Sequence, residues 1–226
     1  MKYGNLTVIG TSHIADDSVS MVREAILAEN TAIVAVELDH ARLHALLSEE
    51  KPRMSLAMLR VMGLTGFVFF AIAGFLQRKL GKMIGAVPGQ EMKTAVQIAQ
   101  EIKIRVALID QPLNITMHSL SRISIWEKLK LARDFVLGIT GIETEKVQFD
   151  LTKTPDSKFV TMAMKKLKER YPGLYKALVA DRNEYMARML ARLMKLEPQS
   201  RIVAVVGAGH ERDIVKLVKK AIDSNS

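Results

Sequence analysis

The stretch IVAVVGAGH, residues 202–210, decides the fold that this chain is predicted to adopt. Its first part, Ile202–Val206, is apolar, mostly β-branched and not interrupted by polar residues, which is typical of a strand buried on both faces of a sheet. Gly207 and Gly209 then let the backbone turn sharply, and His210 adds an imidazole. The stretch therefore predicts a buried strand that ends in a polar loop.

Further apolar runs resemble this strand, and amphipathic helical patterns separate them. The runs are Leu6–Ile9, Ile33–Val36 and Val106–Ile109. Such an alternation predicts an α/β fold, with a mostly parallel central sheet flanked by helices. Long helical insertions, at about 54–83 and 122–197, interrupt the alternation, and Tyr171-Pro172-Gly173 marks a break within the second. Because no low-complexity linker occurs, we expect a single domain over residues 1–226.

Composition narrows the possible chemistry. The chain has no cysteine, which excludes disulfides, thiolate zinc sites and thiol nucleophiles. Its net charge of +9 is concentrated at 78–82, 165–170 and 216–220, which could meet nucleic acid or anionic lipid, although solvated helix faces explain the pattern more simply. Aromatic residues are sparse and are not interleaved with these basic runs, so we expect no nucleic-acid partner.

One segment bears on localisation. Residues 61–76 carry no charge, but a membrane-spanning helix needs about 20 such residues. We therefore expect a helix that is buried, lies at a membrane surface or packs in a homo-oligomer interface. No secretory signal opens the chain, so the domain is expected to be cytoplasmic, or membrane-associated on the cytoplasmic side.

Polar residues follow every predicted strand at its carboxyl end, where parallel α/β sheets bind ligands. They are Gly10-Thr11-Ser12-His13, Glu37-Leu38-Asp39, Asp110 and Gly207-Ala208-Gly209-His210. Histidine supplies either a metal-binding nitrogen or a proton-transfer group. Two matching G-x-x-H loops favour a functional site over two unrelated surface histidines.

Arg182 is predicted to be buried, because the residues at i−4, i+3, i+4 and i+7 from it are all apolar. A buried guanidinium must be paired, and Glu37, Glu91 and Asp110 are available carboxylates. Arg182 could form a structural ion pair, or it could bind an anionic group or stabilise an oxyanion. Glu91 also opens a predicted helix, where the helix dipole alone favours an acidic residue.

Together these motifs resemble those of a known family. G-T-S-H, V-E-L-D, P-G-Q-E-M, L-I-D, D-R-N-E-Y-M-A and G-A-G-H occur in the same order in the TraB/PrgY pheromone-shutdown family, which is related to the Tiki metalloproteases. The resemblance extends from about residue 5 to residue 215. It departs at Asp181-Arg182-Asn183, where the family often has E-R-D or E-R-N, and at Gln111, where the family often has arginine.

The resemblance implies a divalent-metal-dependent, peptidase-like site. The implied residues are His13, His210 and Glu37 as metal ligands; Glu37, Arg182, Glu91, Asp110 and Asn183 as catalytic residues; and Gly10, Ser12, Gly207 and Gly209 as ligand-binding residues. Two imidazoles with one carboxylate suit Zn²⁺, Mn²⁺ or Co²⁺ and leave positions open for water. Similar archaeal and bacterial proteins continue into membrane-spanning helices, so the resemblance also implies a membrane-spanning continuation beyond residue 226.

Two functions remain open from the sequence. The first is a metal-dependent hydrolase that acts on pheromone-like peptides. The second is a regulatory protein at a membrane surface that captures a peptide or other ligand without cleaving it. No H-E-x-x-H motif occurs, so an ordinary zincin mechanism is not expected in either case.

Overall fold

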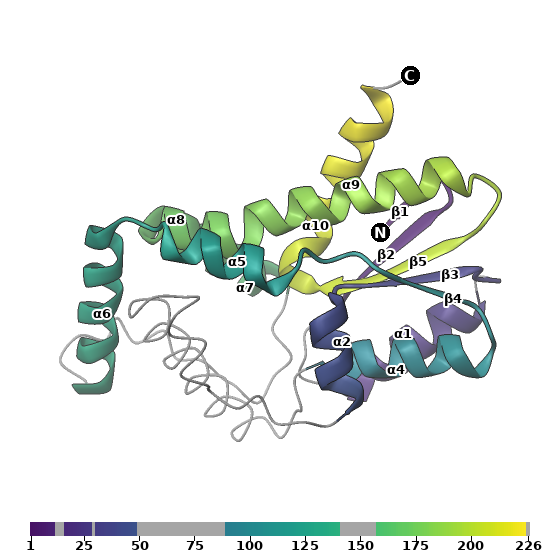
Figure 1. Ribbon diagram of the computed structural model, residues 1–226, viewed down its shortest axis with the longest axis horizontal. Coiled ribbons are helices and arrows are strands. Elements are labelled where there is room, and N and C mark those ends of the chain that lie inside the picture. The colour runs from purple at the N-terminus through teal and green to yellow at the C-terminus, as the bar shows by residue number, and fades with distance from the viewer. Residues whose placement is uncertain (12–15, 29, 49–88, 141–156, 225–226) are drawn as a thin grey trace.

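The polar ends of the strands meet at one edge of a mixed sheet in the computed structural model, which describes residues 1–11, 16–28, 30–48, 89–140 and 157–224 (Figure 1). The described strands are β1 (Lys2–Tyr3), β2 (Leu6–Thr11), β3 (Ile33–Val36), β4 (Arg105–Leu108) and β5 (Ile202–Gly207). Their order in the sheet is β1-β2-β5-β3-β4. Only β1 runs antiparallel, so the prediction of a mostly parallel sheet is confirmed.

Helices flank this sheet and extend beyond it. The described ones are α1 (Asp16–Ala28), α2 (His40–Leu47), α4 (Gln90–Glu101), α5 (Leu113–Ser121), α6 (Ile125–Thr140), α7 (Ser157–Arg170), α8 (Pro172–Tyr175), the π-helix η1 (Lys176–Ala180), α9 (Asp181–Leu196) and α10 (Ala208–Asp223). The predicted break at Tyr171-Pro172-Gly173 is found, since α7 ends at Arg170 and α8 begins at Pro172. The whole predicted helical insertion 54–83, which includes the apolar segment 61–76, lies outside the described residues.

The last strand in the sequence lies in the middle of the sheet. β5 pairs with β2 on one side and with β3 on the other, with Thr11 opposite Gly207 and Val36 opposite Val205. This placement explains why β5 is buried along its whole length and contains no polar residue. It also brings the G-x-x-H loop after β5 next to the polar ends of β2 and β3.

Successive residues of β5 point to opposite faces of the sheet. Ile202, Ala204 and Val206 pack in a cluster with α9 and α10, whereas Val203 and Val205 pack with α1 and α4. Figure 1 shows α9 and α10 on one side of the sheet and α1, α2 and α4 on the other. Both faces are therefore covered, as the apolar strands predicted.

Three strands differ from their predicted boundaries. Strand β2 continues to Thr11 and β5 to Gly207, because these residues stay in register with each other in the ladder. Strand β4 begins at Arg105 and ends at Leu108, one residue earlier than predicted; Ile109 still donates its N–H to Val36 O, at 3.1 Å. Strand β1 was not predicted, because its two residues are too few to form a recognisable strand pattern in the sequence.

Within the described residues, no helix combines the length and hydropathy that crossing a membrane requires.

Candidate functional site

Glu37 and Asp110 leave the sheet side by side: Glu37 directly follows β3, and Asp110 is the second residue after β4. The Glu37 N–H donates to Val205 O of the central strand at 3.1 Å, and the Asp110 N–H donates to Leu38 O at 3.3 Å. The Glu37 carboxylate reaches back across the end of β5, where its Oε2 accepts a hydrogen bond of 2.7 Å from the N–H of Gly207. Backbone hydrogen bonds therefore fix both carboxylates at one edge of the sheet.

Arg182 points inward from the first turn of α9 and binds both carboxylates. Its Nε donates to Asp110 Oδ1 at 3.1 Å, its Nη2 donates to Asp110 Oδ2 at 2.7 Å, and Nη2 also donates to Glu37 Oε1. The remaining nitrogen, Nη1, donates to Leu178 O at 3.2 Å. The side chain is 15% exposed, so the inward orientation predicted from helical periodicity is confirmed. The fork-shaped pair with Asp110 gives the guanidinium a defined orientation as well as a charge partner.

Asp110 is also bound by a second arginine, which the sequence did not reveal. Its side chain is fully buried and accepts hydrogen bonds from Arg42 of α2 and from the N–H of Gln111. Burial alone would raise the pKa of Asp110, but Arg182 and Arg42 outweigh burial and hold the pKa below its usual value. Arg42 gave no sequence signal because α2 has no buried residues from which a buried face could be inferred.

His210, in the first turn of α10, is the described histidine that joins this cluster. Its Nδ1 lies 2.6 Å from Asn183 Oδ1, and its Nε2 lies 3.3 Å from Glu37 Oε1. Burial lowers the pKa of the imidazole, and Arg182 adds to this effect against the opposing influence of Glu37. With the amide oxygen of Asn183 as its partner, Nδ1 is the donor, and Nε2 is the ring nitrogen on the side of Glu37.

The other predicted residues fall into three groups. Glu91 is buried in the first turn of α4, and Asn183 is buried against His210. Gly10 and Gly209 lie where other chain segments come close: a Cβ on Gly10 would be 3.1 Å from Ala208 Cα, and one on Gly209 would be 3.0 Å from Met164 Cε. Ser12 and His13 lie outside the described residues.

Asp39 and Gln111, which also follow β3 and β4, have local structural partners. Asp39 caps α2 through the N–H of Arg42 at 2.7 Å and accepts the N–H of Leu113 at 2.6 Å. Gln111, at the position where the TraB/PrgY pattern often has arginine, donates from Nε2 to Thr116 Oγ1 at 2.8 Å. Both side chains are buried and hold the starts of helices in place.

The cluster can hold a proton or a cation at one point. Nε2 of His210 lies 3.3 Å from Oε1 of Glu37, a separation that a shared proton or cation can bridge. Among the described residues no group of three histidine, aspartate or glutamate side chains is arranged to hold a metal ion. The predicted meeting of His13 with His210 at one ion stays a prediction.

Comparison with known proteins places these residues in a wider context. The profile of the TraB/PrgY/gumN family matches residues 2–221. An uncharacterized protein of Methanocaldococcus jannaschii is 33% identical over 98% of this chain and 55% of its own length. TraB domain-containing proteins of Homo sapiens and Bos taurus are 26% and 25% identical over 92% of this chain and 61% of theirs. The chain thus spans little more than half the length of the curated relatives it matches.

Proposed function

This chain belongs to the TraB/PrgY/gumN family, and we propose that it is a divalent-metal-dependent hydrolase acting on peptides. The observation that carries the proposal is the convergence of His210 Nε2 and Glu37 Oε1 at 3.3 Å, beside a buried arginine. Family membership alone would not assign an activity, because one fold can host many chemistries.

The spacing of these two atoms fits a shared ion. Two ligand atoms that each lie about 2.0–2.1 Å from a tetrahedral Zn²⁺ are about 3.3–3.4 Å apart. Imidazole nitrogen with carboxylate oxygen is also a ligand set suited to Zn²⁺, Mn²⁺ or Co²⁺. When bound, such an ion supplies Lewis acidity toward a carbonyl oxygen.

We propose His13 as a further ligand. It follows Thr11, the last residue of β2, by two positions, and Thr11 pairs with Gly207, three residues before His210. The repeated G-x-x-H spacing thus starts from neighbouring, parallel strands. Gly10, Ser12, Gly207 and Gly209 belong to the same two loops and are proposed to let a substrate backbone approach.

The remaining residues orient the ligands. Asn183 accepts from Nδ1 of His210, which fixes the tautomer that leaves Nε2 free to bind an ion. Arg182 and the N–H of Gly207 hold the two oxygens of Glu37, and Asp110 holds Arg182. Arg182 is further proposed to stabilise negative charge that develops on a substrate carbonyl oxygen. Glu91 stays a candidate as a buried carboxyl near the start of α4.

The same cluster could serve a protein that captures a peptide without cleaving it. Membrane association, in which a longer protein would hold this domain at a cytoplasmic surface, and homo-oligomerisation also remain proposals. An assay that detects cleavage of peptides distinguishes a hydrolase from a protein that only captures them.

The test is digestion of a mixed peptide library, followed by mass spectrometry, with Zn²⁺ or Mn²⁺ added and with a chelator. We expect cleavage that the chelator abolishes and that Glu37→Gln reduces by at least about a hundredfold, since loss of a main catalytic group commonly costs that much. Glu101→Gln, at the exposed end of α4, is the matched control and should cleave normally. Cleavage that survives both the chelator and Glu37→Gln would contradict the proposal, and specific peptide binding without cleavage would favour capture.

A further inference from the structure

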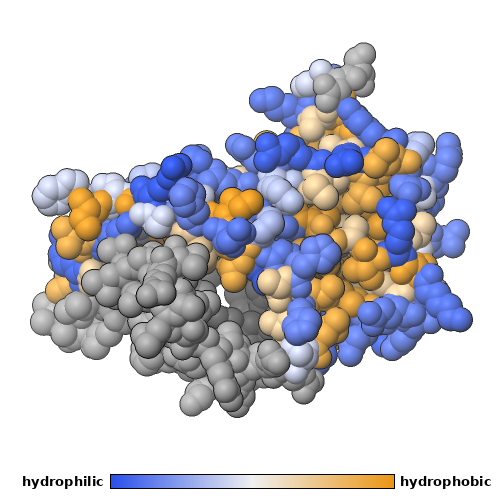
Figure 2. Space-filling model, in the orientation of Figure 1, coloured by the Kyte–Doolittle hydropathy of each residue, from blue (hydrophilic) through white to orange (hydrophobic). Residues whose placement is uncertain are grey.

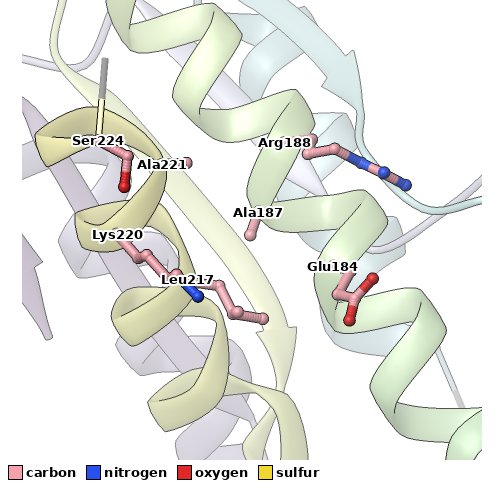
Figure 3. A pocket seen from close by; sticks show the side chains of 7 residues that line it. All are labelled: Glu184, Ala187, Arg188, Leu217, Lys220, Ala221 and Ser224. Atoms are coloured by element: carbon pink, nitrogen blue, oxygen red, sulfur yellow. The ribbon is translucent and has the colours of Figure 1, made fainter. Parts of the chain in front are cut away.

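A groove runs between α9 and α10, further along both helices than Arg182 and His210. It consists of two adjoining hollows that share Arg188 and Ala221, the first with a volume of about 250 Å³. The first is also lined by Glu184, Ala187, Leu217, Lys220 and Ser224, and the second by Ala191, Arg192, Lys195 and Leu196. Figure 3 shows Ala187 of α9 and Leu217 of α10 pointing toward each other across the first hollow.

Small residues create the floor of this α9–α10 groove. Ala187, Ala191 and Ala221 occupy positions where larger side chains would fill the space between the helices. Leu217 and Leu196 add apolar surface, and Leu196 is 68% exposed at one end of the groove. Ala187 and Ala191 are buried, so the accessible apolar surface of the groove comes from Ala221, Leu217 and Leu196.

Basic residues form the rim of the groove. Arg188, Arg192 and Lys195 stand on α9, and Lys220 stands on α10, all of them exposed. Within the part of the chain that the structure describes, no ion pair engages any of these four. Glu184 is the acidic residue of the lining. Figure 2 shows strongly hydrophilic side chains beside apolar ones over these two helices.

We propose that the α9–α10 groove binds an acidic amphipathic helix of a partner protein. Its apolar side chains would pack on Ala221, Leu217 and Leu196, and its carboxylates would pair with the four rim cations. From Glu184 to Lys195 the α9 side of the groove extends over eleven residue steps, or about 16 Å, which matches about three helical turns.

The shape of the groove favours a helix over a bilayer. The apolar residues lie at the bottom and the cations stand at the rim, so a flat anionic membrane would contact the charges and leave the floor uncovered. A helix presents a ridge of side chains that fits between two other helices. The polar residues that meet at the strand ends, Glu37, Asp110, Arg182, His210 and Arg42, form the strand-end cluster. None of the groove residues belongs to this cluster, so the proposal does not depend on the metal site.

The experiment uses a fluorescein-labelled synthetic peptide of about 18 residues, long enough to form a helix. Leucines form one stripe and glutamates flank it; a scrambled peptide of the same composition lacks the stripe. Binding to the 226-residue chain is followed by fluorescence anisotropy. The groove variants are Arg188→Glu/Arg192→Glu, which reverses the rim charge, and Ala221→Phe, which fills the floor shared by both hollows.

The control variant, Arg23→Glu/Lys166→Glu, makes the same change in net charge at exposed positions of α1 and α7. We expect the striped peptide to bind at least about tenfold more tightly than the scrambled one, and each groove variant to weaken it about tenfold or more. The control variant should bind as the unmodified chain does. Circular dichroism verifies that each variant is folded.

Equal binding of the scrambled peptide, or equal loss in the control variant, would show attraction by net charge alone and would overturn the proposal. So would the absence of peptide binding together with tight binding to phosphatidylserine vesicles, because the groove would then face a membrane.

Discussion

Arg182 illustrates why the strand-end cluster depends on complete pairing. Two arginines, Arg182 and Arg42, face two carboxylates, Glu37 and the fully buried Asp110. Each charge has lost much of its hydration, and only its partners compensate for that loss. Removal of one member leaves another buried and unpaired, which costs more than the pair itself contributes.

At this scale the first prediction concerns Arg182→Met, which preserves much of the side-chain volume and removes the charge. In this variant Glu37 loses its guanidinium partner, and Asp110 keeps Arg42 as its one charged partner. We therefore expect the free energy of unfolding to fall by about 3–5 kcal/mol. Urea denaturation measures it. Arg192→Met, at an exposed position of the same helix, should change it by less than about 0.5 kcal/mol. A similar small effect at Arg182 would mean that the cluster contributes little to stability.

The buried imidazole of His210 is expected to make the stability of the fold depend on pH. Burial lowers the pKa of its imidazole from the ordinary value of 6.5, so below that pH the unfolded chain binds a proton that the folded chain does not. The free energy of unfolding therefore decreases as the pH falls below 6.5. His210 accounts for up to about 1.4 kcal/mol of this decrease for each pH unit, until the pKa of the folded state is reached. His210→Gln should lose less stability than the unmodified chain between about pH 7.5 and about pH 5.5 in urea titrations. Equal losses in both proteins would contradict the shift.

At the scale of elements, the sequence predicted the strands better than the contacts between them. The four predicted strands were found within a few residues of their predicted limits, because each has an uninterrupted apolar run; β3 and β5 are buried throughout, whereas the edge strand β4 is only partly buried. The inward face of α9 was also predictable, from the apolar residues around Arg182. The pairing of Arg42 with Asp110 was not, because it depends on how α2 packs, and the leucines of α2 that contact the core, Leu43 and Leu46, are only partly buried.

The junction of β2 with α10 gives a prediction about an element boundary. An alanine at Gly10 would place its Cβ 3.1 Å from the Cα of Ala208, a backbone atom at the start of the helix that carries His210. We expect Gly10→Ala to lower the free energy of unfolding by about 1–3 kcal/mol, since backbone must move to accept it. Thermal denaturation followed by circular dichroism measures the loss.

Gly209→Ala is the matched control for this prediction. There the new Cβ would meet Cε of Met164, the end of a flexible side chain, and alanine is a better helix former than glycine by about 1 kcal/mol. This variant should be as stable as the unmodified chain or more stable. If Gly10→Ala were equally harmless, the close approach of β2 and α10 would not constrain the position of His210.

For the whole molecule, topology assembles the site from distant parts of the chain. Glu37, Asp110, Arg182 and His210 come from four separate segments and meet because β5, the last strand, lies between β2 and β3. Strand order cannot be derived from apolar periodicity, since each buried strand has the same pattern. Therefore the sequence named Glu37, Asp110, Arg182 and His210 as candidates, while Arg42 and the contacts among all five required the structure. The same is true of the α9–α10 groove, whose floor is made of alanines that carry no distinctive pattern.

The most direct test of the account is the metal content of the purified chain. After equilibration with Zn²⁺ and removal of free ion, mass spectrometry should find about one ion per chain, as a site of this ligand type would hold. His210→Gln and Glu37→Gln should each lower this ratio severalfold while circular dichroism shows a folded protein, because each removes a proposed ligand. His118→Gln, on the exposed side of α5, should retain the full ratio. A chain that binds no ion, or whose ion content is unchanged by both site variants, would contradict the assignment of His210 and Glu37 as a metal-binding pair.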